Sequence, residues 1–358
     1  MNDTLQMMRE LTEAPGVPGQ ERAVRTVMQR YFEPLGEIMT DNLGSIACRK
    51  VGSAANPTIV VGGHMDEIGF MVTRITDEGY LKFQTLGGWV SQVMLAQRVE
   101  IITRAGPILG VIGSKPPHIM PAEERKKPIE IKDMYIDIGA RSKDEATEWG
   151  IRPGDMVVPV SPFTHMRNEE LLLAKAWDNR LGCAVAIEVL RQLQDTQHPN
   201  AVYGVATVQE EIGLRGARTM AYLTDPDISF IIDTAIAGDT PGVTPDDVVA
   251  KVGEGPVVLL YDATMVPHTG LRDFVVDTAQ TVGIPLQFDK MAGGGTDAGA
   301  FHVFGRGVPS LVLGTPVRYI HSHSSMMHMG DFQQLVTLLV ALIKRLDADT
   351  VAALKANA

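Results

Sequence analysis

Cysteine is scarce in this chain, which has only Cys48 and Cys183 among its 358 residues. Two cysteines far apart in apolar surroundings offer no disulfide framework, so we expect buried free thiols. Free thiols are typical of proteins that work in a reducing compartment. Acidic residues interrupt the N-terminal stretch MNDTLQMMRELTEAPG, which therefore resembles a capped helix more than a signal peptide. We expect a cytoplasmic protein.

Long hydrophobic runs and an excess of positive charge are missing as well. The longest apolar run, LVTLLVALI at 335–343, is too short to span a bilayer. The 32 Lys and Arg residues are outnumbered by 43 Asp and Glu residues, and the net charge of -11 disfavours contact with nucleic acid or an anionic membrane. We therefore expect a soluble globular protein whose partners are neither nucleic acids nor membranes.

The chain is longer than one compact core usually is, and its pattern changes twice. Residues 1–67 combine helical spacing with a buried strand in PTIVVGGHMDEIG. From 68 to 163, short alternating segments such as FMVTRI and QRVEIIT are separated by Gly-containing turns, without a long amphipathic helix. From 164 to 358, strands and helices alternate again and end on one long amphipathic run at 331–356.

This organisation predicts an α/β fold with a small inserted domain. Alternating strands and helices imply a mixed, mostly parallel sheet sandwiched by helices, formed by residues 1–67 and 164–358. The β-rich segment 68–163 is expected to fold separately as a small barrel between these two parts.

Several predicted strands end in a carboxylate or an imidazole. Taken singly, each of these residues has an ordinary structural explanation, such as a turn, a helix N-cap or a solvated loop. Open α/β sheets, however, place their sites beside the carboxyl ends of the strands, so we expect these side chains to converge. They are His64 and Asp66 in IVVGGHMDE, Asp178 in AKAWDNRLG, Glu210 and Glu211 in VQEEIG, Asp233 in FIIDTA, and His321 and His323 in VRYIHSHSS.

Most of these side chains suit a pair of catalytic metal ions. Two imidazoles and three carboxylates, with no thiolate, favour a pair of Zn, Co or Mn ions over a structural zinc. Two ions close together need a bridging carboxylate and a shared water or hydroxide. We expect Asp178 to bridge, with His64 and Asp233 on one ion and Glu211 and His321 on the other.

The adjacent glutamates Glu210 and Glu211 need their own explanation, because like charges this close repel one another. Neighbouring side chains point to opposite faces within a strand, but at a strand-to-loop turn they diverge only modestly. We expect Glu211 to bind metal and Glu210, kept off the metal, to act as general base on the bridging water. Asp66 is expected to orient His64 through its second ring nitrogen.

Six motifs follow one another at spacings that cover nearly the whole chain: GGHMDEIG, AWDNRLG, QEEIGLRGA, IIDTA, GGGTDAGAFH and RYIHSH. Together they resemble the tetrahedral (glutamyl-type) aminopeptidases, a family of cytosolic dinuclear metallopeptidases. The segment from GVIGSKPPHIM to GARSKDEA is similar to the inserted domain of that family. The resemblance implies a PDZ-like inserted domain used for dimerisation, and dimers that assemble into a hollow tetrahedral dodecamer taking short peptides.

The resemblance also implies roles for individual residues. Carried over motif by motif, it makes Glu210 the general base and Asp66 its supporting carboxylate. The implied metal ligands are His64, Asp178, Glu211, Asp233 and His321.

The glycine-rich loop AGGGTDAGAFH has two explanations. Its glycines permit tight turns or a close approach to a ligand. Gly294, Gly295, Thr296 and Asp297 therefore form either a wall of the substrate pocket or a purely structural turn. No Lys follows as it would in a phosphate-binding loop.

Three histidines have open roles. His118 in SKPPHIM either reaches an active site from the inserted domain or lies on a rigid surface loop. His323 and His328 in HSHSSMMH depart from the family pattern, and we do not assign them as ligands.

The function that this sequence indicates is removal of the N-terminal residue from short peptides by a metal-activated water, with zinc, cobalt or manganese as the metal. Another metal-dependent amide hydrolase on the same scaffold, such as a deacylase, deblocking peptidase or carboxypeptidase, is the nearest alternative. A non-catalytic metal-binding assembly protein and a glycosidase, which also uses paired acids, are more distant alternatives. No sequence feature selects the preferred N-terminal residue.

Overall fold

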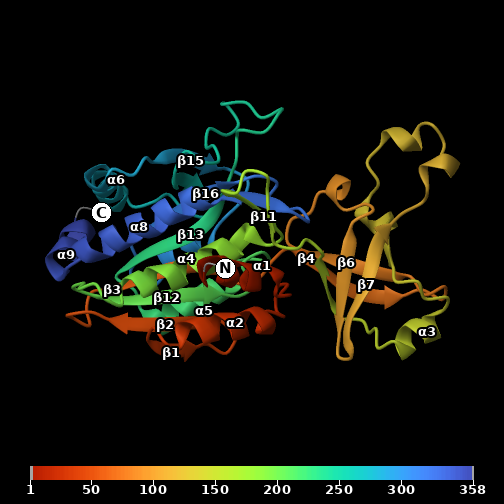
Figure 1. The fold of residues 1–358 in the computed structure, drawn as a ribbon, viewed down its shortest axis with the longest axis horizontal. Coiled ribbons are helices and arrows are strands. Elements are labelled where there is room, and N and C mark those ends of the chain that lie inside the picture. Colours follow the sequence, from red (N-terminus) through yellow and green to blue (C-terminus); the bar gives the residue numbers. More distant parts are fainter. Residues whose placement is uncertain (1–2, 357–358) are drawn as a thin grey trace.

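A mixed eight-stranded sheet forms the centre of the computed structural model, which describes residues 3–356 (Figure 1). Its central strands run parallel, whereas antiparallel pairings lie toward both edges. The mixed α/β fold is therefore confirmed. The order across the sheet is β1 (Glu37–Thr40), β2 (Ile46–Val51), β12 (Ala201–Thr207), β3 (Thr58–His64), β13 (Ile228–Ile236), β16 (Ser310–Val317), β14 (Val257–Asp262) and β15 (Gln287–Met291).

The central strand β3 shows why the sequence has a continuous apolar run followed by two glycines. Every residue from Ile59 to His64 is buried, as expected for a parallel strand covered on both faces. A Cβ atom on Gly62 would lie 1.9 Å from the carbonyl oxygen of Val205 in β12. The neighbouring strand therefore leaves no room for a side chain at this position, just before β3 delivers His64 to the edge of the sheet.

Helices cover both faces of the sheet, because alternate residues of each strand point to opposite sides. In β3, Ile59 and Val61 belong to one hydrophobic core and Val60 to the other. The larger core packs against α1 (Asp3–Glu13), α2 (Arg22–Phe32), α4 (Trp177–Gln192), α6 (Thr269–Val282), α8 (Met329–Arg345) and α9 (Ala348–Ala356). The smaller core packs against α5 (Arg215–Thr224) and α7 (Asp297–His302).

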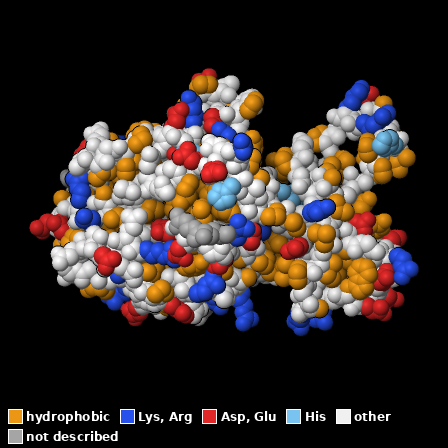
Figure 2. All heavy atoms as spheres, viewed as in Figure 1, with side chains coloured by type: hydrophobic (Ala, Val, Ile, Leu, Met, Phe, Trp, Pro, Cys, Tyr) orange, Lys and Arg blue, Asp and Glu red, His pale blue; other side chains and the backbone are white. Residues whose placement is uncertain are grey.

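Six further strands close into a barrel with its own apolar interior, which includes Phe70, Val99 and Ile136. The barrel extends from one end of the α/β part, and a notch separates the upper portions of the two parts (Figures 1 and 2). This confirms the expected barrel. Its strands are β4 (Gly69–Ile75), β5 (Leu81–Leu86), β6 (Arg98–Thr103), β7 (Gly106–Gly113), β8 (Tyr135–Asp137) and β9 (Met156–Pro159), with α3 (Lys143–Glu148) and the short 3-10 helices η1 (Ser91–Val93), η2 (Pro117–Ile119), η3 (Glu124–Lys126) and η4 (Ile131–Asp133) in its connections.

A small antiparallel sheet joins segments that are distant in sequence. It consists of β10 (Thr164–His165), β11 (Leu171–Ala174) and β17 (Ser325–His328). Strand β11 leads into α4, whereas β17 follows the loop that carries His321. The small sheet therefore holds the His321 loop beside the start of α4.

Two expectations about the chain have clear outcomes. The run 331–356 is two helices, α8 and α9, and not one, because the chain leaves α8 at Leu346 and Asp347 then accepts the backbone N–H of Thr350 at 2.8 Å to begin α9. Cys48 and Cys183 are buried free thiols, as expected. None of the helices within residues 3–356 has the length and hydrophobicity needed to cross a bilayer.

Candidate metal centre

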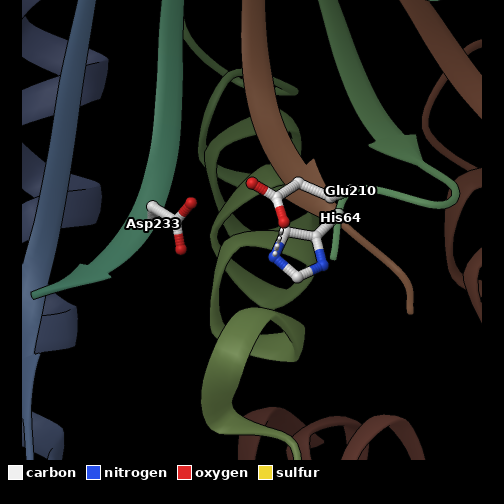
Figure 3. A group of neighbouring side chains, drawn as sticks. All are labelled: His64, Glu210 and Asp233. Carbon is white, nitrogen blue, oxygen red and sulfur yellow. Dashed lines mark ion pairs between the residues drawn. The ribbon is translucent and has the colours of Figure 1, made fainter. Parts of the chain in front are cut away.

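A cavity of about 840 Å³ lies beside the carboxyl ends of the parallel strands. Strand β3 ends at His64, β12 leads into Glu210 and Glu211, and β13 carries Asp233 near its end. Figure 3 shows His64, Glu210 and Asp233 reaching toward one another from these separate segments. Open α/β sheets place their ligands at this edge. The side chains that line the cavity include His64, Asp178, Glu210, Glu211, Asp233 and His321.

Asp178 lies between the two imidazoles of this cluster. Its Oδ1 atom is 3.3 Å from Nε2 of His64, and its Oδ2 atom is 3.5 Å from Nε2 of His321. The backbone at Asp178 is not helical, although it falls within the first turn of α4, and the N-cap residue of that helix is Ala176. Asp178 is therefore not the helix cap, and its two oxygens face the Nε2 atoms of two different histidines.

Both imidazoles are held in the same way by backbone carbonyl groups. Nδ1 of His64 lies 3.0 Å from the carbonyl oxygen of Asp66, and Nδ1 of His321 lies 2.8 Å from that of Gly88. Because a carbonyl oxygen only accepts hydrogen bonds, each Nδ1 must carry the proton. In the neutral ring the lone pair is then on Nε2, which faces the carboxylates. This orientation is characteristic of metal-binding histidines.

Asp66 explains how two adjacent glutamates are held at a turn. Its Oδ1 atom accepts the backbone N–H of Glu210 and its Oδ2 atom accepts that of Glu211, both at 3.0 Å. Oδ1 also lies 3.5 Å from Nδ1 of His64. The carboxylate is completely buried. Asp66 therefore fixes the backbone from which both glutamate side chains extend, in addition to its contact with the histidine ring.

The carboxylates fall into two groups that share His64. Nitrogen and oxygen atoms of His64, Glu210 and Asp233 lie within 4.8 Å of one another, and so do those of His64, Asp178 and Glu211. Oε2 of Glu210 is 3.8 Å from Nε2 of His64, and Oε2 of Glu211 is 3.7 Å from Nε2 of His321. Glu210 therefore lies among atoms that could hold a cation, whereas the sequence analysis expected this residue to be kept off the metal.

The cluster carries more carboxylates than its two imidazoles can neutralise. Burial, together with the charge of Asp178, raises the pKa of Glu211 and that of Asp233 to about 8. Burial also raises the pKa of Glu210 well above its ordinary value. Burial opposes a charge on His321 as well, but Asp178 and Glu211 outweigh it and raise the pKa of this histidine to about 10. Without cations, protons must therefore be shared within the cluster.

The donor set fits a pair of divalent cations. Imidazole nitrogens and carboxylate oxygens without thiolates suit catalytic Zn, Co or Mn. Oε1 of Glu211 is buried and has no hydrogen-bond partner within the described part of the chain, which normally destabilises a protein. A pair of cations held by this cluster would give Oε1 of Glu211 and the two Nε2 atoms partners.

The glycine-rich loop only partly lines the cavity. Gly294 and Gly295 are on its wall, whereas Thr296 and Asp297 are buried behind it. The Thr296 hydroxyl donates to Asp262 at 2.9 Å, and Asp297 accepts a hydrogen bond from Thr207. The two polar residues therefore support the start of α7.

The remaining histidines lie outside the cluster. His118 is exposed on η2 of the barrel and is not among the residues that line the cavity. Nε2 of His328 faces Glu170 at 3.3 Å. His323 is buried with its ring edge against Trp89, and burial lowers the pKa of this histidine to about 4.

The sequence-based search missed much of the cavity wall. Leu214 and Arg218 reach it from the start of α5, and Lys290 and Met291 from the end of β15. For Leu214 and Arg218 a signal was available, because both follow Glu211 closely in the sequence, at the turn and the helix start that come after it. Lys290 and Met291 had no such signal, because nothing local indicates that β15 lies beside this edge.

A family model described as M42 glutamyl aminopeptidase matches residues 44–338 of this chain. Among curated relatives, the glutamyl aminopeptidase of Lactococcus lactis is 37% identical over 352 residues, covering 97% of this chain and 98% of the relative. The lysyl aminopeptidase of Pyrococcus furiosus is 33% identical over 348 residues, covering 95% and 97%.

Several solved structures are similar over nearly the whole chain. A TET aminopeptidase from a marine sediment archaeon of the Thaumarchaeota is 46% identical, with a TM-score of 0.97 and coverage of 99% of this chain and 100% of that one. A TET1 peptidase of Pyrococcus horikoshii, described as assembling into a tetrahedron or a large octahedral shell, is 33% identical with a TM-score of 0.86 and coverage of 96% and 100%. A Thermotoga maritima structure described as an endoglucanase is 28% identical with a TM-score of 0.78 and coverage of 98% and 99%.

Proposed function

Because this chain belongs to the M42 glutamyl aminopeptidase family, we propose that it removes the N-terminal residue from short peptides with the help of two divalent metal ions. The family membership confirms the resemblance that the six sequence motifs indicated. The observation that carries the proposal is the position of Asp178, whose two oxygens face the Nε2 atoms of two histidines that are both held by backbone carbonyl groups.

Five residues are proposed as ligands. His64 and Asp233 would hold one ion, Glu211 and His321 the other, and Asp178 would bridge them. When bound, such a pair acidifies a water molecule and polarises a carbonyl group. Zinc is the metal we propose first, and cobalt and manganese suit the same ligands.

Glu210 is the proposed general base. Its backbone is fixed by Asp66, and its carboxylate extends into the cavity wall beside His64. In a cluster that holds cations, the carboxylate would be ionised and able to take a proton from the attacking water, then return it to the leaving amine. A free substrate amino group, bound near the metal centre or a carboxylate, would restrict cleavage to the first peptide bond.

We also propose that the protein self-associates in the cytoplasm. The Pyrococcus horikoshii relative is described as forming tetrahedral or octahedral shells. For this chain we propose a catalytic α/β domain formed by residues 1–67 and 164–358 and a PDZ-like inserted domain at residues 68–163. The inserted domain would form dimers, and the dimers would assemble into a tetrahedral dodecamer. Gly294 and Gly295, on the cavity wall, are proposed to contact the peptide.

Replacement of Glu210 by Gln tests the chemical role directly. The amide has the same shape but cannot accept the proton, so kcat should fall by about 10²–10⁴-fold. Two ions per subunit should remain bound, as measured by elemental analysis. A loss to one ion would assign Glu210 as a ligand, because this carboxylate lies close to His64 and Asp233. Retention of full activity would refute the mechanism. The matched control is Glu78→Gln at an exposed turn of the barrel.

Substrate panels distinguish the alternatives. Peptides with a free amino group should be cleaved and N-acetylated peptides should not, whereas the opposite result would indicate a deacylase or deblocking peptidase. Release of C-terminal residues would indicate a carboxypeptidase. The panel should also include a glucan, because one similar structure is described as an endoglucanase. Glycosidases require two carboxyl groups and no imidazole ligands, so chelator-resistant glucan hydrolysis would favour that alternative.

A further inference from the structure

We propose that the barrel segment Gly87–Trp89 is a positioning element for the metal centre, acting through His321 and His323. The inference rests on the proposed function, because it assigns His321 to a metal ion. It gives the barrel a role inside the catalytic site of its own subunit, and it gives His323 a role that requires no ligand atom.

His321 is the ligand that most needs support from outside its own segment. Its side chain is 38% exposed, whereas that of His64 is 2% exposed. The backbone of His321 has a φ of 55°, which places a non-glycine residue in the left-handed region. Asp178 and Glu211 face Nε2 of the ring, whereas its other nitrogen, Nδ1, is held by the carbonyl oxygen of Gly88 at 2.8 Å, which the barrel supplies.

The two glycines of this segment allow the barrel backbone to approach the centre. A Cβ atom on Gly88 would lie 3.0 Å from Nδ1 of His321, and one on Gly87 would lie 3.0 Å from Oε2 of Glu211. Both values are too short for ordinary packing contacts. The backbone of the segment thus lies directly against two of the five proposed ligands, and a side chain at Gly88 would displace the ring that the carbonyl group orients.

Trp89 connects this approach to the barrel core and to the His321 loop. Its ring stacks on Phe70 with centroids 4.6 Å apart, and its Nε1 atom donates to the carbonyl oxygen of Gly69 at 3.1 Å. It also contacts His323, whose ring meets it edge-on at a centroid distance of 5.2 Å. Trp89 therefore holds the loop two residues beyond His321.

His323 acts through the packing of its ring and not through hydrogen bonds. Both of its nitrogen atoms are buried, and neither has a hydrogen-bond partner among residues 3–356. The contact with Trp89 is one that an aromatic ring makes without polar atoms. Phenylalanine should therefore replace His323 without loss, whereas alanine should release the loop.

Metal binding to the metal-free protein is the measurement that tests this role. Isothermal titration with Zn²⁺ should show two ions per subunit for the wild type. In Gly88→Ala and in His323→Ala, the affinity for one of the two ions should fall by about 10–100-fold, as for other losses of support around a metal ligand. His323→Phe should restore both ions to within about twofold of wild type, since a ring is all that the contact requires.

Controls separate positioning from general destabilisation. Gly113→Ala changes another barrel glycine, where the added Cβ would lie 2.9 Å from the ring atom Cε2 of Tyr135 and away from the cavity wall, and it should leave metal binding unchanged. Thermal unfolding of the metal-free variants reports whether each is folded, and the His323 pair carries the test if Gly88→Ala does not fold. Wild-type affinity for both ions in folded Gly88→Ala and His323→Ala, or equal losses in His323→Ala and His323→Phe, would overturn the inference. Failure of the wild type to bind two ions would instead refute the proposed function on which it rests.

Discussion

Replacement of Asp66 by Asn should disrupt the turn that carries the two glutamates, because this carboxylate holds the backbone of that turn. The carboxylate uses one oxygen for each of two backbone N–H groups, those of Glu210 and Glu211, at 3.0 Å. An asparagine side chain has one carbonyl oxygen and one NH₂ group, so it can accept only one of these bonds. The other N–H would face a donor in a fully buried position.

The size of the effect follows from these contacts. A hydrogen bond to a charged acceptor contributes about 1.5–3 kcal/mol, and an orphaned buried N–H destabilises by about 1–3 kcal/mol. We therefore expect the free energy of unfolding to fall by about 3–5 kcal/mol, a large share of the 5–15 kcal/mol typical of a folded protein. Loss of the hydrogen bond should also misplace Glu210. If this raises the activation free energy by about 3 kcal/mol, kcat falls by about 10²-fold.

The assay is steady-state cleavage of a peptide with a free amino group, combined with urea unfolding. We expect a large fall in kcat with a small change in KM, because Asp66 does not line the cavity. The control is Asp41→Asn, since the Oδ1 atom of Asp41 accepts three backbone N–H groups in a turn that is not part of the cavity wall. Asp41→Asn should retain kcat. A folded Asp66→Asn enzyme with kcat within about twofold of wild type would refute this reasoning, because a loss of about 3 kcal/mol corresponds to a far larger factor.

Two further predictions concern protons. Burial, with the nearby charge of Asp66, raises the pKa of Glu21 from 4.5 to about 7, so the folded chain keeps a proton that the unfolded chain loses as pH rises. The contribution of Glu21 to the free energy of unfolding should therefore fall as the pH rises from about 4.5 to 7. In urea titrations, Glu21→Gln should stabilise the metal-free protein by up to about 3 kcal/mol at pH 8 but little at pH 4.5. An equal effect at both pH values would contradict this. Metal binding must displace protons from His321, Glu211 and Asp233, because the pKa of His321 is raised to about 10 and those of the two acids to about 8. Zinc affinity should therefore rise from pH 6 to 9, with proton release detectable calorimetrically in buffers of different ionisation enthalpy, and a pH-independent affinity would show that these groups do not bind the metal.

The amino-acid sequence by itself determined the class of fold, and it marked several strands of the sheet with candidate site residues at their ends. Buried parallel strands such as β3 leave a continuous apolar run, and helices leave a 3.6-residue spacing. His64, which ends β3, and Glu211, which follows β12, were therefore identifiable as candidate site residues, because strand ends and their chemistry are local properties. The barrel was predicted for the same reason, from short alternating segments between turns.

Only the tertiary structure decided how those side chains are supported. Asp66 and Glu210 are 144 residues apart in sequence, and Gly88 and His321 are 233 apart, yet each pair shares a hydrogen bond. Such contacts arise because the sheet order places β3 beside β12 and because the barrel packs against the His321 loop. Periodicity and composition describe each segment alone and carry no information about which distant backbone atom it will meet. The cavity wall formed by Arg218 and Lys290 depends on the same long-range packing.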